Sequence, residues 1–373
     1  MRLSRLAFVF GLTLIGCTAG DGGTAALAQG RPFQVETLAT FNEPWAMTFL
    51  PTGQALITER RGRLKLWTPG GAEIDVAGVP AVSYGGQGGL GDVVLHPDFA
   101  RNHLVYLSFV EAGEGDLRGA VVGRGRLIVE NGAARIEGFA IIWRQQPKVD
   151  GGGHFSHRIA FGPDRMLYIS SGERQHFDPA QDMTGNLGKV VRLNEDGSPP
   201  ADNPWSDRGG VTAQIWTLGH RNLLGLAFAP DGNLWEVEMG PQGGDELNLV
   251  RRGLNYGYPR ASNGSHYDGR DIPDHRPGDG FEPPKVWWNP SISPSSLIVY
   301  TGAMFPAWRG DALIGALSGQ ALIRVDIDGA NAVKADQWDM GARIREVEQG
   351  PDGAVYLLQD GASGQLLRLT PRR

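Results

Sequence analysis

The sequence contains almost no cysteine. Cys17 is the only one among 373 residues. A lone thiol forms neither an internal disulfide nor a thiolate metal site, so both are excluded as sources of stability. The folded protein must depend on its hydrophobic core or on bound ions.

Clusters of one charge are also missing. The formal net charge is −6, and the 35 lysines and arginines are scattered along the chain. Proteins that bind nucleic acid carry a basic face, and those that bind membrane surfaces carry basic runs. The sequence therefore argues against both kinds of partner.

The N-terminus lacks the long apolar run of a membrane span. Arg2 and Arg5 precede an apolar stretch at 6–15, which is shorter than the roughly 20 residues that a spanning helix needs. This pattern is typical of a secretory leader. We therefore predict a leader over 1–28 and a periplasmic protein.

Two cleavage sites compete in this leader. Residues 14–17 (LIGC) resemble a bacterial lipobox, in which Cys17 becomes the lipidated first residue. Residues 26–28 (ALA) form a small-residue site that would release a protein starting at Gln29. We favour the lipobox and a lipid anchor at Cys17, because the second site lies far from the apolar stretch, with Asp21 between them.

Helical periodicity is scarce, whereas residues that form turns are abundant. The chain has 55 glycines and 24 prolines, too many for a helical bundle. In the segment 219–259, two apolar runs, Leu223–Phe228 and Leu234–Met239, flank the turn sequence Ala-Pro-Asp-Gly at 229–232. This arrangement predicts a β-hairpin.

The same hairpin recurs along the chain. In the fifth and weakest copy, Met304-Phe305 precede the turn and Ala312–Gly315 follow it. The turn prolines lie 45 to 76 residues apart, and four-stranded propeller blades take about 40–50 residues before loops are added. The six turns begin at Pro51, Pro97, Pro163, Pro230, Pro306 and Pro351.

These repeats predict an all-β fold, a six-bladed β-propeller of four-stranded antiparallel blades in one domain over 29–373. Pairing of the chain ends closes a propeller, and Phe33–Leu38 and Gln365–Leu369 are the segments that would pair. The longest irregular stretch runs from Arg260 to about Pro290 and predicts a functional loop. Trp287-Trp288 at its end predict that this loop packs over a neighbour.

Polar residues gather where the hairpins begin and end. In an antiparallel pair, the start of one strand and the end of its partner lie at the same edge, and loops there often build sites. We expect several repeats to bring their polar residues to one rim. These residues are His154 before the third repeat, Gln87 before the second, Arg221, Asn222 and the loop Gly240–Glu246 around the fourth, and Arg343 with Arg345 on one face of the sixth.

This inventory suits a planar ligand that carries several negative charges. Arginine forks bind carboxylates through paired hydrogen bonds. Backbone carbonyls with Asp245 and Glu246 provide the hard oxygen ligands that Ca²⁺ prefers. The alternatives are a surface salt bridge at the arginines and a solvated turn at the acidic pair.

Several long segments resemble the soluble, pyrroloquinoline quinone (PQQ)-dependent glucose/sorbosone dehydrogenases, especially the bacterial periplasmic aldose sugar dehydrogenases. The resemblance extends from Pro44 to Arg368. The family fold is a six-bladed propeller, in agreement with the repeats. The matching segments are GQGGLGDVVLHPDF, the loop around His154, LGKVVRLNEDGSPPADNPW, TLGHRNLLGLAF, GPQGGDELNLVRRGLNYGYP and RIREVEQGPDG.

The resemblance implies a role for each matching residue. His154 matches the catalytic base, and Arg221 matches a residue at the reactive edge of the quinone. Gly240 and Pro241 match the carbonyls that bind the calcium beneath PQQ. The implied cofactor-binding residues are Gln87, Arg221, Asn222, Arg343 and Arg345, and the implied ligands of a further calcium are Asp245, Glu246 and Tyr256.

Two positions depart from the family pattern. Gly153 stands where the glucose dehydrogenases have an aspartate before the catalytic histidine, so His154 needs another orienting partner or a water. Ser318 stands where a lysine commonly reaches the quinone, so one cation is lost from the cofactor site.

The implied reaction is oxidation of an aldose at its C1 hydroxyl to the lactone, with His154 as general base. Two other functions fit a propeller: a calcium-dependent lactonase, which has no use for Arg343 and Arg345, and a non-catalytic binding protein, which would not need PQQ. The sequence leaves open the preferred aldose, the electron acceptor, and whether the protein is a monomer or a dimer.

Overall fold

A computed structural model describes residues 30–372, of which 31–372 belong to one compact unit. The predicted leader, with Cys17 and both cleavage sites, lies outside the described residues. Within 30–372, no helix has both the length and the apolar character needed to cross a membrane.

Regular structure is almost entirely antiparallel β-strand, which confirms the all-β prediction. Three sheets each take four consecutive strands. They are β10 (Ser156–Phe161), β11 (Leu167–Ser171), β12 (Lys189–Leu193) and β13 (Ile215–Leu218); β14 (Leu223–Phe228), β15 (Leu234–Glu238), β16 (Asp245–Val250) and β17 (Val286–Trp288); and β18 (Pro294–Val299), β19 (Ala312–Ala316), β20 (Ala321–Asp328) and β21 (Asn331–Asp339).

An eight-stranded sheet contains two further four-stranded sets, joined by parallel pairing of β5 with β9. The first set is β2 (Pro44–Phe49), β3 (Ala55–Glu59), β4 (Arg63–Trp67) and β5 (Glu73–Ala77), and the second is β6 (Leu90–Leu95), β7 (Leu104–Ala112), β8 (Arg118–Glu130) and β9 (Ala133–Arg144). The helices are short: α1 (Phe99–Asn102) and 3₁₀ turns at Asp178–Gln181, Ser206–Arg208, Thr212–Gln214 and Pro306–Trp308.

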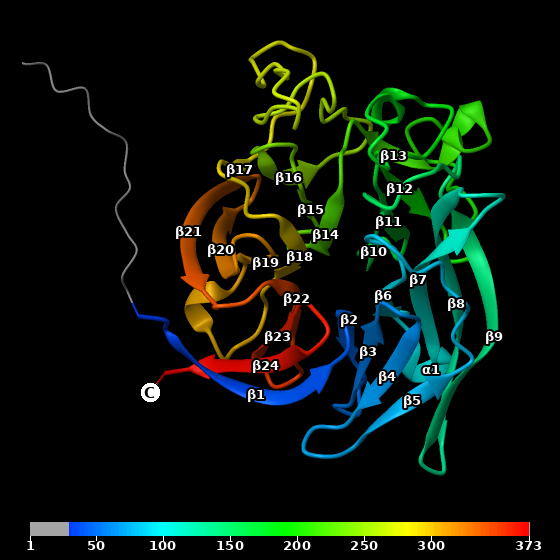
Figure 1. Cartoon of the computed structure of the whole chain (residues 1–373), viewed down its shortest axis with the longest axis vertical. Helices are drawn as coiled ribbons and strands as arrows, with labels where there is room; N and C mark the ends of the chain where they lie inside the picture. Colours follow the sequence, from blue (N-terminus) through cyan, green and yellow to red (C-terminus); the bar gives the residue numbers. More distant parts are fainter. Residues whose placement is uncertain (1–29, 373) are drawn as a thin grey trace, which may run out of the picture. The chain divides into compact units, whose positions relative to one another are not determined.

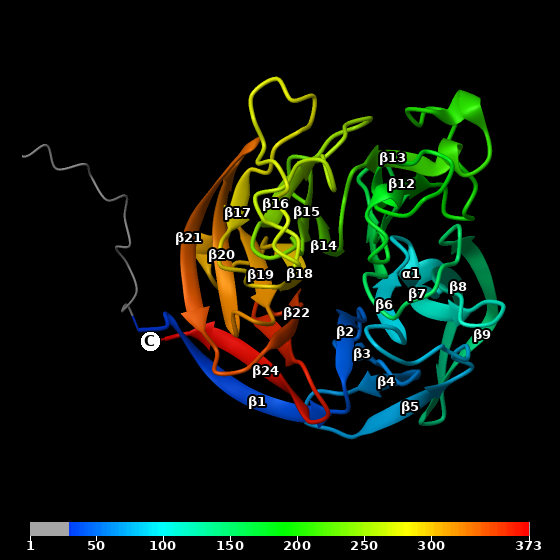
Figure 2. The ribbon, with the colours of Figure 1, turned by 45° about the horizontal axis from the view of Figure 1, so that its top comes forward.

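The last sheet joins the two ends of the described chain. It contains β22 (Ile344–Gln349), β23 (Val355–Gln359), β24 (Gly364–Pro371) and β1 (Phe33–Phe41). Phe33 pairs with Pro371, and Phe41 pairs with Gly364. The predicted pairing of the chain ends is confirmed, and Figure 2 shows β1 (blue) alongside β24 (red).

The first strands of the four-stranded sets meet around a common centre. In chain order, each of β2, β6, β10, β14, β18 and β22 contacts the next, and β22 contacts β2. Figure 1 shows these strands innermost and the other strands of each set fanned outward. The ends of the inner strands therefore lie close together, although they come from distant parts of the sequence.

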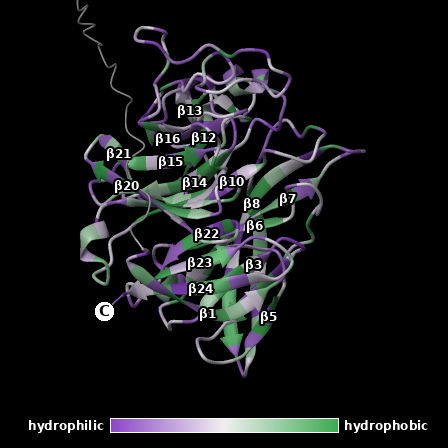
Figure 3. Ribbon diagram, turned by 60° about the vertical axis from the view of Figure 1, so that its left-hand side comes forward, coloured by the Kyte–Doolittle hydropathy of each residue, from purple (hydrophilic) through white to green (hydrophobic). Residues whose placement is uncertain are grey.

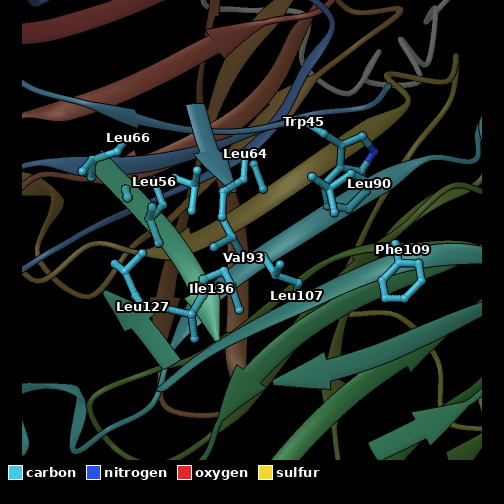
Figure 4. Packing of buried hydrophobic residues seen from close by; sticks show 14 of the residues in the cluster. Trp45, Leu56, Leu64, Leu66, Leu90, Val93, Leu107, Phe109, Leu127 and Ile136 are labelled. Carbon is cyan, nitrogen blue, oxygen red and sulfur yellow. The ribbon is translucent and has the colours of Figure 1, made fainter. Parts of the chain in front are cut away.

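The hydrophobic core is distributed between neighbouring sheets. Strands such as β3 and β12 are buried along their whole length, because a neighbouring sheet covers each face. Figure 4 shows one such layer, in which Trp45, Leu56 and Leu64 pack against Leu107 and other residues of the adjoining set. Figure 3 shows that the strands carry most of the apolar residues and the connecting loops most of the polar ones.

Arg158 ties the inner strands together at the centre. Its guanidinium lies 2.7 Å from the Glu346 carboxylate and 3.4 Å from that of Asp92. It also donates to the carbonyl oxygens of Leu224 (2.7 Å) and Ser295 (2.6 Å). Burial raises the pKa of Glu346 to about 8, although Arg158 opposes this shift. Five of the inner strands thus share one cation.

The predicted fifth hairpin is wrong in its first strand. The strand that pairs with β19 is β18, whereas Met304-Phe305 lie in the connection that follows it. Phe305 is buried and stacks on Trp308 at a centroid distance of 4.0 Å. The apolar residues before Pro306 therefore fill the core beneath a connection, and the proline begins a 3₁₀ turn.

The end of the long irregular segment also differs from expectation. Trp287-Trp288 form part of β17 rather than a packing loop. Trp288 pairs with Asp245 and is buried, whereas Trp287 is partly exposed. The segment from Arg260 to Lys285 contains no regular strand or helix.

Candidate active site

The loop before β10 places His154 at the rim of the inner strands. Its backbone is unusual, because His154, Ser156 and His157 all have positive φ angles, of 50°, 57° and 62°. Only a few per cent of non-glycine residues adopt this conformation, and three within four positions constrain the local backbone. A tight local backbone therefore sets the direction of the imidazole.

Glu173 is the orienting partner that His154 was expected to need. The Nδ1 atom of His154 forms a short hydrogen bond with Glu173 Oε1. The other oxygen of Glu173 accepts the Phe177 amide at 2.8 Å. A Cβ atom at Gly172 would lie 2.0 Å from the His154 carbonyl oxygen, so only glycine permits this approach. The pair holds the proton on Nδ1 and leaves Nε2 as the basic nitrogen.

Burial sets the charge states of this pair. Burial lowers the pKa of His154 below its usual value, although the Glu173 carboxylate raises it. Burial opposes ionisation of Glu173, but the hydrogen bond with His154 lowers its pKa overall. His154 is therefore neutral near pH 7 and can accept a proton through Nε2.

Gly153 leaves room that another side chain fills. A Cβ atom at this position would lie 2.5 Å from Gln175 Oε1. Gln175 thus occupies the space that a larger side chain at position 153, such as an aspartate, would need. Although position 153 offers no carboxylate, His154 has one in Glu173.

Gln87 lies directly against the loop that carries His154. Its side-chain oxygen accepts the backbone amide of His154 at 2.7 Å. The backbone amide of Gln87 donates to the Gly152 carbonyl at 2.7 Å. A Cβ atom at Gly86 would lie 2.3 Å from the Gly152 carbonyl oxygen. The glycines before Gln87 therefore permit two loops to touch, and the NH₂ group of Gln87 remains for a ligand.

Arg221 and Asn222 lie beside the His154–Glu173 pair. The carbonyl of Arg221 accepts the Glu173 amide at 2.9 Å. The Arg221 guanidinium is buried and donates to the carbonyls of Met239 (2.9 Å) and Gly240 (2.5 Å). Its Nε–H has no partner among the described residues. Asn222 accepts the Ser156 hydroxyl at 3.1 Å.

A cavity of about 380 Å³ opens next to these residues. Each four-stranded set, or a loop next to one of its strands, contributes to the lining. Gln87, Arg343 and Arg345 all line it, so the structure brings these predicted residues together.

Arg343 and Arg345 share one carboxylate that the sequence analysis did not identify. Arg343 Nε lies 2.8 Å from Asp360 Oδ2, and Arg345 donates to Oδ1 at 2.9 and 3.1 Å. Burial opposes ionisation of Asp360, but Arg345 and Arg343 lower its pKa overall. Arg343 lies just before β22 and Arg345 lies within it, and both guanidinium groups meet at this one carboxylate. The group keeps a net charge of +1.

The predicted metal residues surround a much smaller cavity, of about 10 Å³. This volume suits one water molecule or ion. Gly240, Pro241, Glu246 and Tyr256 line it, together with Arg221. One lone pair of the Gly240 carbonyl is engaged by Arg221, and the second remains.

Asp245 and Tyr256 direct their side chains elsewhere. The Asp245 carboxylate accepts three backbone amides, from Gly240 (2.9 Å), Ile292 (2.7 Å) and Ser293 (2.7 Å). The Tyr256 hydroxyl donates to the Leu249 carbonyl at 2.6 Å. Asp245 therefore holds the loop in shape, and the Tyr256 side chain is already hydrogen-bonded.

A buried acidic cluster lies behind Glu246. Glu238 and Glu246 are directly opposite on β15 and β16, and Glu236 lies on the same face. Ligand atoms of His220, Glu236 and Glu238 all lie within 4.8 Å of one another. Burial and the charge of Glu238 raise the pKa of Glu236 to about 7. Asn248 donates to all three glutamates, at 2.8 to 3.4 Å.

Aromatic side chains form a rim next to Arg221. Phe177 is 39% exposed and Tyr267 is 72% exposed. The Phe177 ring lies 5.3 Å from the His266 ring, and the Tyr267 ring lies 5.7 Å from the Arg221 guanidinium. The Phe177 amide is bound by Glu173, so one end of this rim is held by the partner of His154.

The residues that the sequence analysis missed follow a simple rule. Glu173, Asp360 and Arg60 come just after the second strand of their hairpins, β11, β23 and β3. The same rule identified the loop after β15 in the fourth repeat. Applying it to every repeat would have found Glu173 and Asp360, whereas Glu236 gave no signal beyond two-residue spacing.

Comparison with known proteins identifies the family. Residues 41–368 match the glucose/sorbosone dehydrogenase family. Aldose sugar dehydrogenase YliI of Escherichia coli is 40% identical over 339 residues, covering 89% of this chain and 91% of that protein.

Solved structures agree with this match. The soluble E. coli aldose sugar dehydrogenase in its apo form superposes with a TM-score of 0.86 at 40% identity, over 91% of this chain and 100% of that one. The PQQ-bound aldose sugar dehydrogenase of Streptomyces coelicolor gives 0.76 at 27% identity, over 92% and 100%. The chain belongs to the glucose/sorbosone dehydrogenase family.

Proposed function

We propose that this protein oxidises aldose sugars at C1 to the lactone, with PQQ as hydride acceptor and Ca²⁺ as its partner ion. The observation that carries the proposal is the neutral His154, oriented by the buried Glu173, beside a cavity lined by Arg343 and Arg345. The PQQ in the S. coelicolor relative supports the choice of cofactor. We interpret the six four-stranded sets as the blades of a propeller, with the site at one end of its axis.

The residues present fit PQQ. Gln87, Arg343 and Arg345 line the cavity of about 380 Å³ with nitrogen donors that suit an anionic ligand. Arg221 Nε and the Tyr258 hydroxyl, which have no hydrogen-bond partner among the described residues, line the smaller cavity instead. Arg343 and Arg345 would hold carboxylates of the quinone, while the Gln87 amide and Asn222 would contact its rings or oxygens. Bound PQQ supplies the acceptor for the hydride that leaves C1.

The residues also fit calcium. The Gly240 and Pro241 carbonyls are hard oxygen donors next to the cofactor cavity. Glu236, Glu238 and Glu246 are buried close together, with His220 and Arg221 as cationic neighbours. Three carboxylates face two cations, so a divalent ion would offset the remaining repulsion. We propose that Glu246 and the Tyr256 backbone carbonyl belong to a second, structural calcium site, and that Asp245 shapes the loop.

His154 carries out the proton transfer. Its Nε2 takes the proton of the C1 hydroxyl while the hydride leaves C1, so that the sugar loses two electrons and two hydrogens and gains a C=O bond. Glu173 stabilises the imidazolium that forms, and the proton then passes to water. The buried Arg221 places positive charge beside the reacting atoms.

Reconstitution tests the proposal. Purified protein with PQQ and Ca²⁺ should reduce a dye when glucose is added, and omission of PQQ should abolish the reaction. Hydrolysis of a lactone without PQQ would instead support the lactonase. PQQ-independent sugar binding without dye reduction would support a binding protein.

Export also belongs to this proposal. We propose a periplasmic protein with a lipid anchor at Cys17. The intact mass of the mature protein decides, because a chain that starts at Gln29 without an acyl group refutes the anchor.

A further inference from the structure

A second arginine–carboxylate group lies at the cofactor cavity, and none of the predicted site residues belongs to it. Glu43 accepts Arg60 Nη2 at 2.7 Å, Arg61 Nε lies 3.0 Å away, and the Tyr84 hydroxyl donates at 2.8 Å. Burial opposes ionisation of Glu43, but Arg60 and Tyr84 lower its pKa overall. Two guanidinium groups on one carboxylate leave a net charge of +1, as in the Asp360 group.

The two arginines of this group differ in position. Arg60 and Glu43 line the cavity, and the Arg60 side chain is 20% exposed. Arg61 does not line the cavity, and its side chain is 56% exposed. The Arg61 guanidinium lies 4.6 Å from the centre of the Tyr84 ring. Of the two arginines in this group, Arg60 is therefore the one that can contact a ligand in the cavity.

The backbone around Arg60 is fixed against the loop that carries Gln87. The backbone amide of Arg60 donates to the backbone carbonyl of Glu43 at 3.0 Å, and the Arg60 carbonyl accepts the Leu90 amide at 2.9 Å. A Cβ atom at Gly89 would lie 2.0 Å from the Arg60 carbonyl oxygen. Arg60 Nη1 also donates to the Gly86 carbonyl at 2.7 Å. The guanidinium is thus preorganised next to Gln87.

Ser318 does not supply a cation to the same cavity. Its hydroxyl is hydrogen-bonded to Ser293 Oγ at 2.8 Å and to the Ser291 carbonyl at 3.2 Å. Arg60 has five N–H donors, of which the Glu43 and Gly86 contacts use only part. A free edge of the guanidinium remains for an anion.

We infer that Arg60 is a cofactor-binding residue that provides the cation missing at Ser318. This inference rests on the proposed function, because it takes the ligand to be PQQ, a planar aromatic polycarboxylate. The Asp360 and Glu43 groups each present net positive charge to the cavity. A polyanion bound between them is held by Arg60 together with Arg343 and Arg345.

Equilibrium dialysis of the apoprotein against PQQ in the presence of Ca²⁺ tests the inference. Arg60→Gln should weaken PQQ binding by roughly 10- to 100-fold, the usual cost of losing a charge-assisted hydrogen bond. Arg61→Gln is the matched control, since it removes the other arginine of the same group, and it should change binding less than about threefold. Arg60→Lys should recover part of the loss.

A fourth variant separates binding from a purely structural role. Glu43→Gln breaks the same ion pair but leaves the Arg60 charge, so it should bind PQQ at least as tightly as wild type. Equal weakening by Glu43→Gln and Arg60→Gln, with equal losses of melting temperature, overturns the inference. So does equal binding by the Arg60→Gln and Arg61→Gln variants. Absence of PQQ binding by wild type would instead refute the proposed function.

Discussion

Replacement of Glu173 by glutamine tests the proton-transfer step most directly. The substitution keeps the size of a fully buried side chain and the acceptor for the Phe177 amide. It removes the charge and adds an NH₂ group that can donate to His154 Nδ1. The histidine would then carry its proton on Nε2, the nitrogen that should act as the base.

The expected fall in kcat of Glu173→Gln follows from two contributions. Loss of a hydrogen bond to a charged group costs about 1.5–3 kcal/mol, which corresponds to roughly 10- to 150-fold in rate. Loss of general-base catalysis costs about 10²–10⁴-fold. Because some Nδ1-protonated tautomer should persist, we expect kcat to fall by about 10²–10³-fold at saturating PQQ and sugar.

The pH profile distinguishes this mechanism from structural damage. Glu173 raises the pKa of His154 against the effect of burial, so its removal lowers that pKa further. A base must be unprotonated, and activity falls as the pH drops through its pKa. The acid limb of kcat/KM should therefore move to lower pH in Glu173→Gln. A limb that stays in place, or a kcat within a few-fold of wild type, would falsify the assignment of His154 and Glu173 as the catalytic pair.

Four further predictions address other parts of the molecule. Arg345→Ala should raise the PQQ concentration needed for half-maximal activity and recover at saturation, whereas His154→Ala should bind PQQ normally yet remain about 10²–10⁴-fold slow. Chelation should lower the melting temperature by several degrees and abolish activity, because an ion that binds only the folded state stabilises it by mass action. Phe177→Ala should raise KM for glucose about 3- to 10-fold with unchanged PQQ affinity, because an aromatic contact contributes about 0.5–1.5 kcal/mol. Glu346 has a raised pKa, of about 8, so its stabilising contribution is present below the pKa of the unfolded chain and is lost as the pH rises through 8. Glu346→Gln should therefore match wild type in unfolding free energy near pH 5 and exceed it at pH 9, by on the order of 2–4 kcal/mol.

Each of these predictions has a control and a contrary result. A His154→Ala variant that is slow only because PQQ fails to bind removes the evidence for a base. An unchanged melting curve after exhaustive chelation refutes the structural calcium. Trp287→Ala, at a half-exposed aromatic outside the rim, is the control for Phe177→Ala. An equal change in KM for glucose in both variants would refute a role of the rim in sugar binding. Parallel pH curves for Glu346→Gln and wild type would show that Glu346 ionises normally.

Local patterns were sufficient to predict most hairpins. The turn at 229–232 contains Pro-Asp-Gly, and Gly232 adopts the positive φ of 87° that this turn requires. A turn of this kind depends on a few adjacent residues, so its signal survives in the sequence. The prediction of the fifth hairpin failed because Met304-Phe305 have the composition of a strand but lie in a connection, where Phe305 is buried and Met304 is partly buried.

The rim of polar residues was also predictable, since strand alternation and hairpin geometry place His154, Gln87 and Arg221 at matching ends. Family resemblance then suggested a chemistry for them. What these patterns do not contain is the partner of each charge, because ion pairs such as Arg343–Asp360 join residues that flank different strands.

The sequence by itself determined the all-β class, the repeating hairpins, the pairing of the chain ends and the identity of the rim residues. Only the tertiary structure decided that Glu173 contacts His154, that Asp245 binds three amides, and that Arg60 lines the central cavity. Secondary structure depends on neighbours in the chain. The charge and orientation of a buried side chain depend instead on atoms brought close from distant positions, and those contacts exist only once the sheets have packed around their common centre.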